Sequence, residues 1–172
     1  GNATKDGNAT SDADRDAYMF GVRVGKAFNN VSFKPAVTLW YDHLSGTDDA
    51  DQRGSSWNSF NTLFDTGHKF YGLMDVFLGV GGGAAAGTQG LGLQDLAFKT
   101  KINPMPGWTL KADYHWFWTA EGVNANTTTR GFNNTAATDT LGNELGTELD
   151  ITAVTKMNAN TKVMIGYSHY DA

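Results

Sequence analysis

The 172-residue chain has no cysteine, only three prolines and three glutamates, and no long apolar run. The missing cysteine excludes disulfides and thiolate metal sites. Because no run approaches about 20 apolar residues, no helix of this sequence spans a bilayer. This criterion does not apply to membrane-spanning β-strands, which are short and only half apolar. The net charge of −5 argues against nucleic acid as the partner.

Glycine and aromatic residues are abundant, with 21 Gly and, among the aromatics, 5 Trp, 6 Tyr and 10 Phe. Thr, Asn and Asp are also frequent. Aromatic and β-branched residues suit pleated surfaces, while Gly, Asn and Asp suit turns. The composition therefore predicts an all-β chain.

Six segments alternate with a period of two, at roughly the 9 to 11 residues that a tilted strand needs to cross a bilayer. Each has one apolar face and one small or polar face. The predicted strands are 17–28, 31–41, 94–102, 108–118, 147–156 and 161–170.

The connections between these segments alternate in length. Asn29-Asn30, 103–107 and 157–160 read as tight turns, whereas 42–92 and 120–146 are long. Short periplasmic turns and long extracellular loops are typical of outer-membrane barrels. We assign the aromatic stretch 68–80 to the first long loop, as a short helix or an inward-folded segment. Both termini then lie outside, and six strands are few, so we expect a portion of a larger barrel with at least one closing strand after residue 172.

A motif in the first long loop carries a family resemblance. It is a Phe-x-x-Leu-Phe-x-x-x-His-x-x-Tyr-Gly-x-x-Asp element, formed by Phe60, Leu63, Phe64, His68, Tyr71, Gly72 and Asp75. With it, most of residues 37–170 resembles the alginate-export family of bacterial outer-membrane β-barrels. The resemblance implies an antiparallel transmembrane β-barrel of about 18 strands, of which this chain is a six-stranded portion, and passage of an anionic polysaccharide along a cationic lining.

The polar positions of the predicted strands are the candidate pore lining. They are Arg23, Lys34, Asp42, Asp95, Lys99, Lys101, Lys111, Asp113, His115, Glu148, Asp150, Lys156 and Lys162. Seven are positive and five negative, about +2, with one arginine where an alginate pore is expected to have several. This mixed lining favours a general porin-like role; neutralising pairs that only stabilise a polar lumen are the alternative. Tyr114, Trp116 and Trp118 are predicted to form the aromatic girdle.

Metal and catalytic motifs are poorly matched. Asp48, Asp49 and Asp51 are calcium candidates, but the EF-hand pattern fails where Phe60 occupies the final ligand position, so acidic, solvated loop surface is favoured. The four histidines have no zinc-ligand spacing. No nucleophile and base can be paired from spacing, so we expect no enzyme and no cofactor.

We therefore predict a porin-like channel in the outer membrane of a Gram-negative bacterium, for passive passage of hydrophilic solutes, including anionic or polysaccharide ones. Its expected partners are outer-membrane lipid, lipopolysaccharide and the solute. The alternative from another class is a structural or binding β-barrel without an open pore.

Overall fold

The computed structural model describes residues 14–48, 56–62, 68, 70–77, 87–88, 90–122 and 143–172. The elements within these ranges are eight β-strands, and helical backbone among the described residues is limited to Gly87, which confirms the all-β prediction. No helix among the described residues is both long and apolar enough to cross a membrane.

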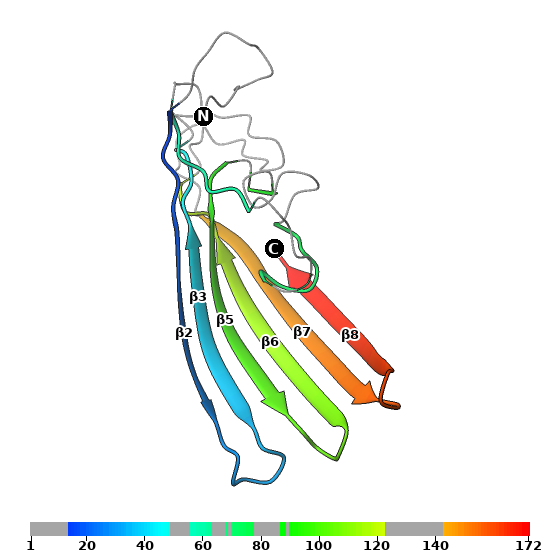
Figure 1. Ribbon diagram of the computed structural model, residues 1–172. Helices are drawn as coiled ribbons and strands as arrows, with labels where there is room; N and C mark the ends of the chain where they lie inside the picture. The colour runs from blue at the N-terminus through cyan, green and yellow to red at the C-terminus, as the bar shows by residue number, and fades with distance from the viewer. Residues whose placement is uncertain are drawn as a thin grey trace.

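Six strands form one antiparallel sheet in the order β2-β3-β5-β6-β7-β8, and each pairs with the next described strand of the sheet along the chain (Figure 1). This meander is the arrangement expected of a portion of an up-and-down barrel. The strands are β2 (Met19–Ala27), β3 (Ala36–Leu44), β5 (Leu93–Ile102), β6 (Trp108–Trp118), β7 (Glu144–Lys156) and β8 (Lys162–Asp171). Two short strands, β1 (Asp14–Arg15) and β4 (Ser56–Trp57), pair in parallel outside it.

The short connections lie together at one end of the sheet (Figure 1). They are residues 28–35, 103–107 and 157–161. Backbone hydrogen bonds join them: Asn103 donates to the Phe33 carbonyl (2.7 Å) and Lys156 to the Gly107 carbonyl (3.2 Å). We call this the turn end; the longer connections leave the opposite, loop end.

The prediction of a strand over 31–41 is wrong at both ends. Phe33 and Lys34 adopt left-handed backbone conformations, with φ of 64° and 44°, and Pro35 has no N–H for a ladder. The turn therefore lasts until Ala36, and Lys34 lies in it rather than on a strand. At the other end β3 continues to Leu44, so Asp42 belongs to the strand and not to the long loop.

The two faces of the sheet are unlike each other. One face, here the polar face, bears Asp42, Asp95, His115 and Glu148, all fully buried. The other, the apolar face, bears exposed side chains such as Leu39, Phe98 and Ile151, with 51%, 42% and 47% of their surface exposed. This is the reverse of a soluble sheet, whose apolar face is buried.

An apolar cluster covers the loop end of the polar face. Its buried members are Leu44, Tyr71, Phe77, Leu93, Phe117 and Leu145, with Phe60, Phe70 and Tyr170 packed against them. Residues 70–77, here the docked segment, supply three of these side chains. Residues 70–77 of the predicted long loop thus fold back onto the sheet, as an inward-folded segment rather than a helix.

Candidate functional site

The strand register brings the polar side chains into rows across the sheet. One row reads Arg23, Trp40, Ala97, His115, Glu148 and Tyr170, and the next towards the turn end reads Gly25, Thr38, Lys99, Asp113, Asp150 and Ser168. Residues far apart in sequence therefore become direct neighbours, since alternate residues of each strand share a face.

An ion pair joins β2 and β3 at one side of these rows. Arg23 Nη2 lies 2.6 Å from Asp42 Oδ1, and the guanidinium carbon lies 3.9 Å from the centre of the Trp40 ring. Trp40 Nε1 donates a 2.8 Å hydrogen bond to Asp42 Oδ2. A side chain at Gly21 would collide with both Arg23 and Asp42. Glycine at this position therefore makes room for the pair.

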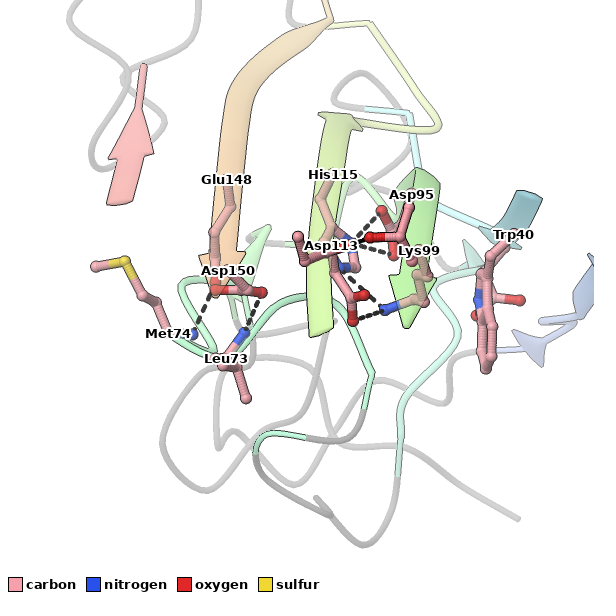
Figure 2. A network of polar contacts seen from close by, with 12 residues as sticks. Trp40, Leu73, Met74, Asp95, Lys99, Asp113, His115, Glu148 and Asp150 are labelled. Carbon is pink, nitrogen blue, oxygen red and sulfur yellow. Dashed lines mark hydrogen bonds and ion pairs between the residues drawn. The ribbon is translucent and has the colours of Figure 1, made fainter. Parts of the chain in front are cut away.

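A second network links β5 and β6 (Figure 2). His115 Nδ1 lies 2.8 and 3.0 Å from the two oxygens of Asp95, and its Nε2 lies 3.1 Å from Lys99 Nζ. Because an ammonium group only donates, Nε2 accepts and Nδ1 carries the proton, which it donates to Asp95. Lys99 Nζ also lies 3.4 Å from Asp113 Oδ2. The four groups form one chain of alternating donors and acceptors.

Two carboxylates of β7 bind the backbone of the docked segment (Figure 2). The Leu73 amide donates to Asp150 Oδ2 at 3.0 Å, and the Met74 amide donates to Glu148 Oε1 at 2.9 Å. A Cβ atom on Gly72, whose φ is +85°, would lie 2.5 Å from the Glu148 carboxylate. Glycine thus allows the backbone to approach the carboxylate directly.

Contacts with His68, just before the docked segment, also fix the shape of the segment. The His68 amide donates to Asp75 Oδ1 at 2.9 Å, and His68 Nδ1 lies 2.7 Å from the Leu73 carbonyl oxygen. Tyr71 and Asp75 have positive φ angles of 60° and 53°. Non-glycine residues in this conformation persist only where surrounding contacts hold them. The segment therefore has a defined backbone conformation, which these contacts maintain.

Aromatic contacts anchor the segment to the sheet at its two sides. The Phe77 ring lies 4.9 Å from that of Phe117 and 5.8 Å from that of Tyr170, and the Phe70 ring lies 6.0 Å from that of Trp40. Tyr71 is 5% exposed. Burial raises the pKa of the Tyr71 hydroxyl well above its usual range, and the carboxylates of Asp42 and Asp95 raise it further. This phenol stays neutral.

The structure brings most of the predicted lining residues to one face. Eight of them take part in the contacts above, namely Arg23, Asp42, Asp95, Lys99, Asp113, His115, Glu148 and Asp150. Lys101, Lys111, Lys156 and Lys162 lie on the same face nearer the turn end, exposed. Lys34 lies in the turn beside them.

The other predicted residues lie away from this face or outside the described residues. Tyr114, Trp116 and Trp118 alternate with the polar residues of β6, so they lie on the apolar face, and the rings of Tyr114 and Trp116 are 4.6 Å apart. Of the calcium candidates, Asp48 is exposed, and Asp49 and Asp51 lie outside the described residues. Within the described ranges, no three His, Asp or Glu side chains gather as metal ligands.

Sequence reasoning did not predict the contacts of Gly72, Leu73 and Met74 with the sheet, although Gly72 belongs to the family motif. Two of these act through their backbone amides, which every residue except proline possesses, so no side-chain pattern marks them. The available signal was Gly72 itself, because glycine adopts a positive φ without the strain that a Cβ atom causes.

A comparison with protein families gives one match over almost the whole chain. A family model described as alginate export matches residues 2–172. The resemblance proposed over residues 37–170 is thereby confirmed and extended towards the N-terminus. No curated protein and no solved structure matches this chain.

Proposed function

The chain belongs to the alginate export family of outer-membrane transport barrels, and from this premise we propose that it forms part of a porin-like channel through which hydrophilic solutes, anionic ones and polysaccharides among them, pass passively. The apolar face contacts outer-membrane lipid, the loop end faces lipopolysaccharide, and the polar face lines a water-filled lumen.

The docked segment is the observation that supports this proposal best. A stretch of a long loop lies against the polar face and is held there by backbone hydrogen bonds to Glu148 and Asp150. On this proposal the segment narrows the lumen and sets the size of solute that passes. The exposed apolar face supports an orientation in which this face is towards lipid, because a large apolar surface is stable in lipid and promotes aggregation in water.

Selection in such a channel needs no covalent chemistry. The fixed charges of the lining include the Arg23–Asp42 and Lys99–Asp113 pairs, at 2.6 and 3.4 Å, and the exposed lysines nearer the turn end. Ions are sorted by the charge and width of the lining. We therefore propose a transport role and no enzymatic step.

The experiment combines planar-bilayer recording with a double variant. Glu148→Gln with Asp150→Asn removes the charged acceptors of the Leu73 and Met74 amides, and charge-assisted hydrogen bonds are roughly twice as strong as neutral ones. We expect the full natural protein to conduct, and the variant to show larger or more frequently fluctuating conductance as the docked segment loosens. Thr147→Val, on the opposite face of the same strand, is the matched control and should conduct like the unmodified protein.

A second function is favoured by the packing at the loop end. Phe77, Phe117 and Tyr170 form a close aromatic cluster over the polar face, as in a lumen that stays filled. The corresponding proposal is a structural or binding barrel without an open pore. Absence of conductance from both the unmodified protein and the double variant, with native heat-modifiable gel migration retained, supports this alternative and contradicts the channel.

A further inference from the structure

Two buried carboxyl groups, those of Glu148 and Asp150, lie next to each other under the docked segment. They are two positions apart in β7, so both project from the polar face. Their side chains are within hydrogen-bonding reach of each other (Figure 2), and their exposed fractions are 0% and 4%. Two carboxyl groups this close and this buried repel each other strongly if both are ionised.

Each of these carboxyl groups uses only one oxygen to hold the docked segment. Glu148 Oε1 accepts from the Met74 amide at 2.9 Å, and Asp150 Oδ2 accepts from the Leu73 amide at 3.0 Å. The other two oxygens, Glu148 Oε2 and Asp150 Oδ1, are buried and accept no hydrogen bond from any residue that the structure describes. A buried polar atom without a partner costs free energy. One proton between these two oxygens satisfies both, because the protonated oxygen donates and the other accepts.

The surroundings of the pair hold no counter-charge for it. No ion pair joins either carboxyl group to a lysine, arginine or histidine that the structure describes. The His115 ring, opposite Glu148, is already hydrogen-bonded to Asp95 and Lys99. Asp113, opposite Asp150, adds a negative charge that Lys99 pairs. The titratable groups on the elements packed against the pair are His115 and Asp113 in β6, Tyr170 in β8, and Tyr71 and Asp75 in the docked segment.

A proton suits this position better than a metal ion. Within the described ranges, no third histidine or carboxylate gathers with the pair to complete a metal site. The docked segment also covers the pair closely, because a Cβ atom on Gly72 would lie 2.5 Å from both oxygens of Glu148. A calcium or magnesium ion needs about six or more ligands, whereas a shared proton needs only the two oxygens.

We propose that Glu148 and Asp150 share one proton while the docked segment is in place, which makes this contact a pH-sensitive switch. The pair then carries a single negative charge, and that charge strengthens the hydrogen bonds from the Leu73 and Met74 amides. Loss of the proton leaves two adjacent carboxylates that repel each other and that reach water only when the segment leaves. The docked state therefore binds one proton more than the released state, so docking weakens as the pH rises.

The role of this switch in transport rests on the proposed function, in which the docked segment narrows the lumen. On that function, alkaline conditions widen the passage and acidic conditions keep it narrow. The shared proton itself requires no open pore, so it can be tested without conductance.

The test measures hydrogen–deuterium exchange of residues 70–77 in the full natural protein in detergent, corrected for the intrinsic exchange rate, between about pH 5 and 9. Tyr71 stays neutral over this range, because its pKa is raised above the ordinary value of 10.0. We expect protection of the Leu73 and Met74 amides to fall as the pH rises. The fall should reach up to about tenfold per pH unit, because one proton is lost for each segment released.

Glu148→Gln imitates the protonated pair, because its amide nitrogen donates to Asp150 Oδ1 while its oxygen still accepts from the Met74 amide. Unlike the double variant described above, it retains one negative charge. We expect the segment to stay protected, with less than about a twofold change over the same range. Asp150→Asn exchanges the roles of the two side chains and serves if Glu148→Gln fails to fold. Glu144→Gln, at an exposed position of the same strand, is the matched control and should keep the full pH response.

Several outcomes overturn the shared proton. They are protection that does not change with pH in the unmodified protein, an unchanged pH response in both Glu148→Gln and Asp150→Asn, and loss of the response in Glu144→Gln. Release of the segment by a metal chelator at the acidic end of the range also overturns it, since a cation would then hold the pair. A pH-dependent segment in a protein that does not conduct contradicts the channel and supports the shared proton, whereas conductance with a pH-independent segment does the reverse.

Discussion

The buried carboxylates of the sheet each have a donor of a particular kind. Asp42 has a guanidinium and an indole, Asp95 an imidazole, and Glu148 and Asp150 have backbone amides. Burying an ionised group is costly unless it is paired and hydrogen-bonded. Residues on the polar face are thus constrained by their partners. Removal of one partner should lower the free energy of unfolding more than removal of both members of the pair.

Glycine at position 72 gives a residue-scale prediction. Ala at Gly72 combines an unfavourable φ with a Cβ placed 2.5 Å from the Glu148 carboxylate, whereas Gly107 has a similar φ of +80° with open space around it. Backbone strain alone should make Gly107→Ala cost about 1–2 kcal/mol. We expect Gly72→Ala also to release the docked segment, seen as faster limited proteolysis near residues 70–77. Equal cleavage of the two variants would contradict the close approach.

Tyr71 gives a pH-dependent prediction. Its pKa in the folded protein is raised above the ordinary value of 10.0. Below that value the phenol is neutral in both states and costs nothing; above it the released segment ionises more readily, so stability falls as pH rises. We expect proteolysis of the docked segment to accelerate as the pH rises above about 10, and Tyr71→Phe to reduce that acceleration.

Tyr167→Phe is the control for this measurement, because Tyr167 is 61% exposed. Its pH profile should match that of the unmodified protein. An identical acceleration in the Tyr71→Phe variant would show that another group governs the alkaline response.

At the scale of elements, alternation predicted strands well where nothing interrupts the ladder. Residues 108–118 alternate strictly, and β6 spans Trp108–Trp118. The same alternation continues through Phe33 and Lys34, but their left-handed conformations before Pro35 end the strand. The period of two reflects only the order of polar and apolar side chains and contains no information on backbone conformation. The prediction based on it therefore extended that strand into a turn.

The docked segment shows a second limit of sequence reasoning. Its composition indicated a loop with aromatic residues, and an inward-folded form was one of two expectations. Its position on the sheet depends on hydrogen bonds from the Leu73 and Met74 amides to two carboxylates that lie more than 70 residues further along the chain. These hydrogen bonds follow from strand register and three-dimensional packing. By contrast, the charged residues of the polar face follow directly from the period of two.

At the scale of the whole molecule, the sheet has an inverted distribution of polarity. Charged and polar side chains are buried on one face, and large apolar side chains are exposed on the other. Among the described strands, β2 and β8 each pair on one side only, so the sheet has two open edges. In a closed barrel, such edges are paired with further strands. Charge is also divided along the strands, with ion pairs towards the loop end and, at the turn end, lysines that have no ion pair with any residue the structure describes. A lumen with such a gradient treats solutes differently from its two sides.

The orientation of the two faces can be measured with single cysteines, because these 172 residues contain none. Phe98 and Lys101 are both exposed and lie on the same strand, but on opposite faces. In outer-membrane vesicles we predict that Lys101→Cys reacts with a water-soluble maleimide, while Phe98→Cys stays unreactive and a probe attached there before reconstitution is quenched by lipid-phase quenchers. Labelling of Phe98→Cys from water, with Lys101→Cys protected and lipid-quenched, would contradict a sheet whose polar face lines a lumen.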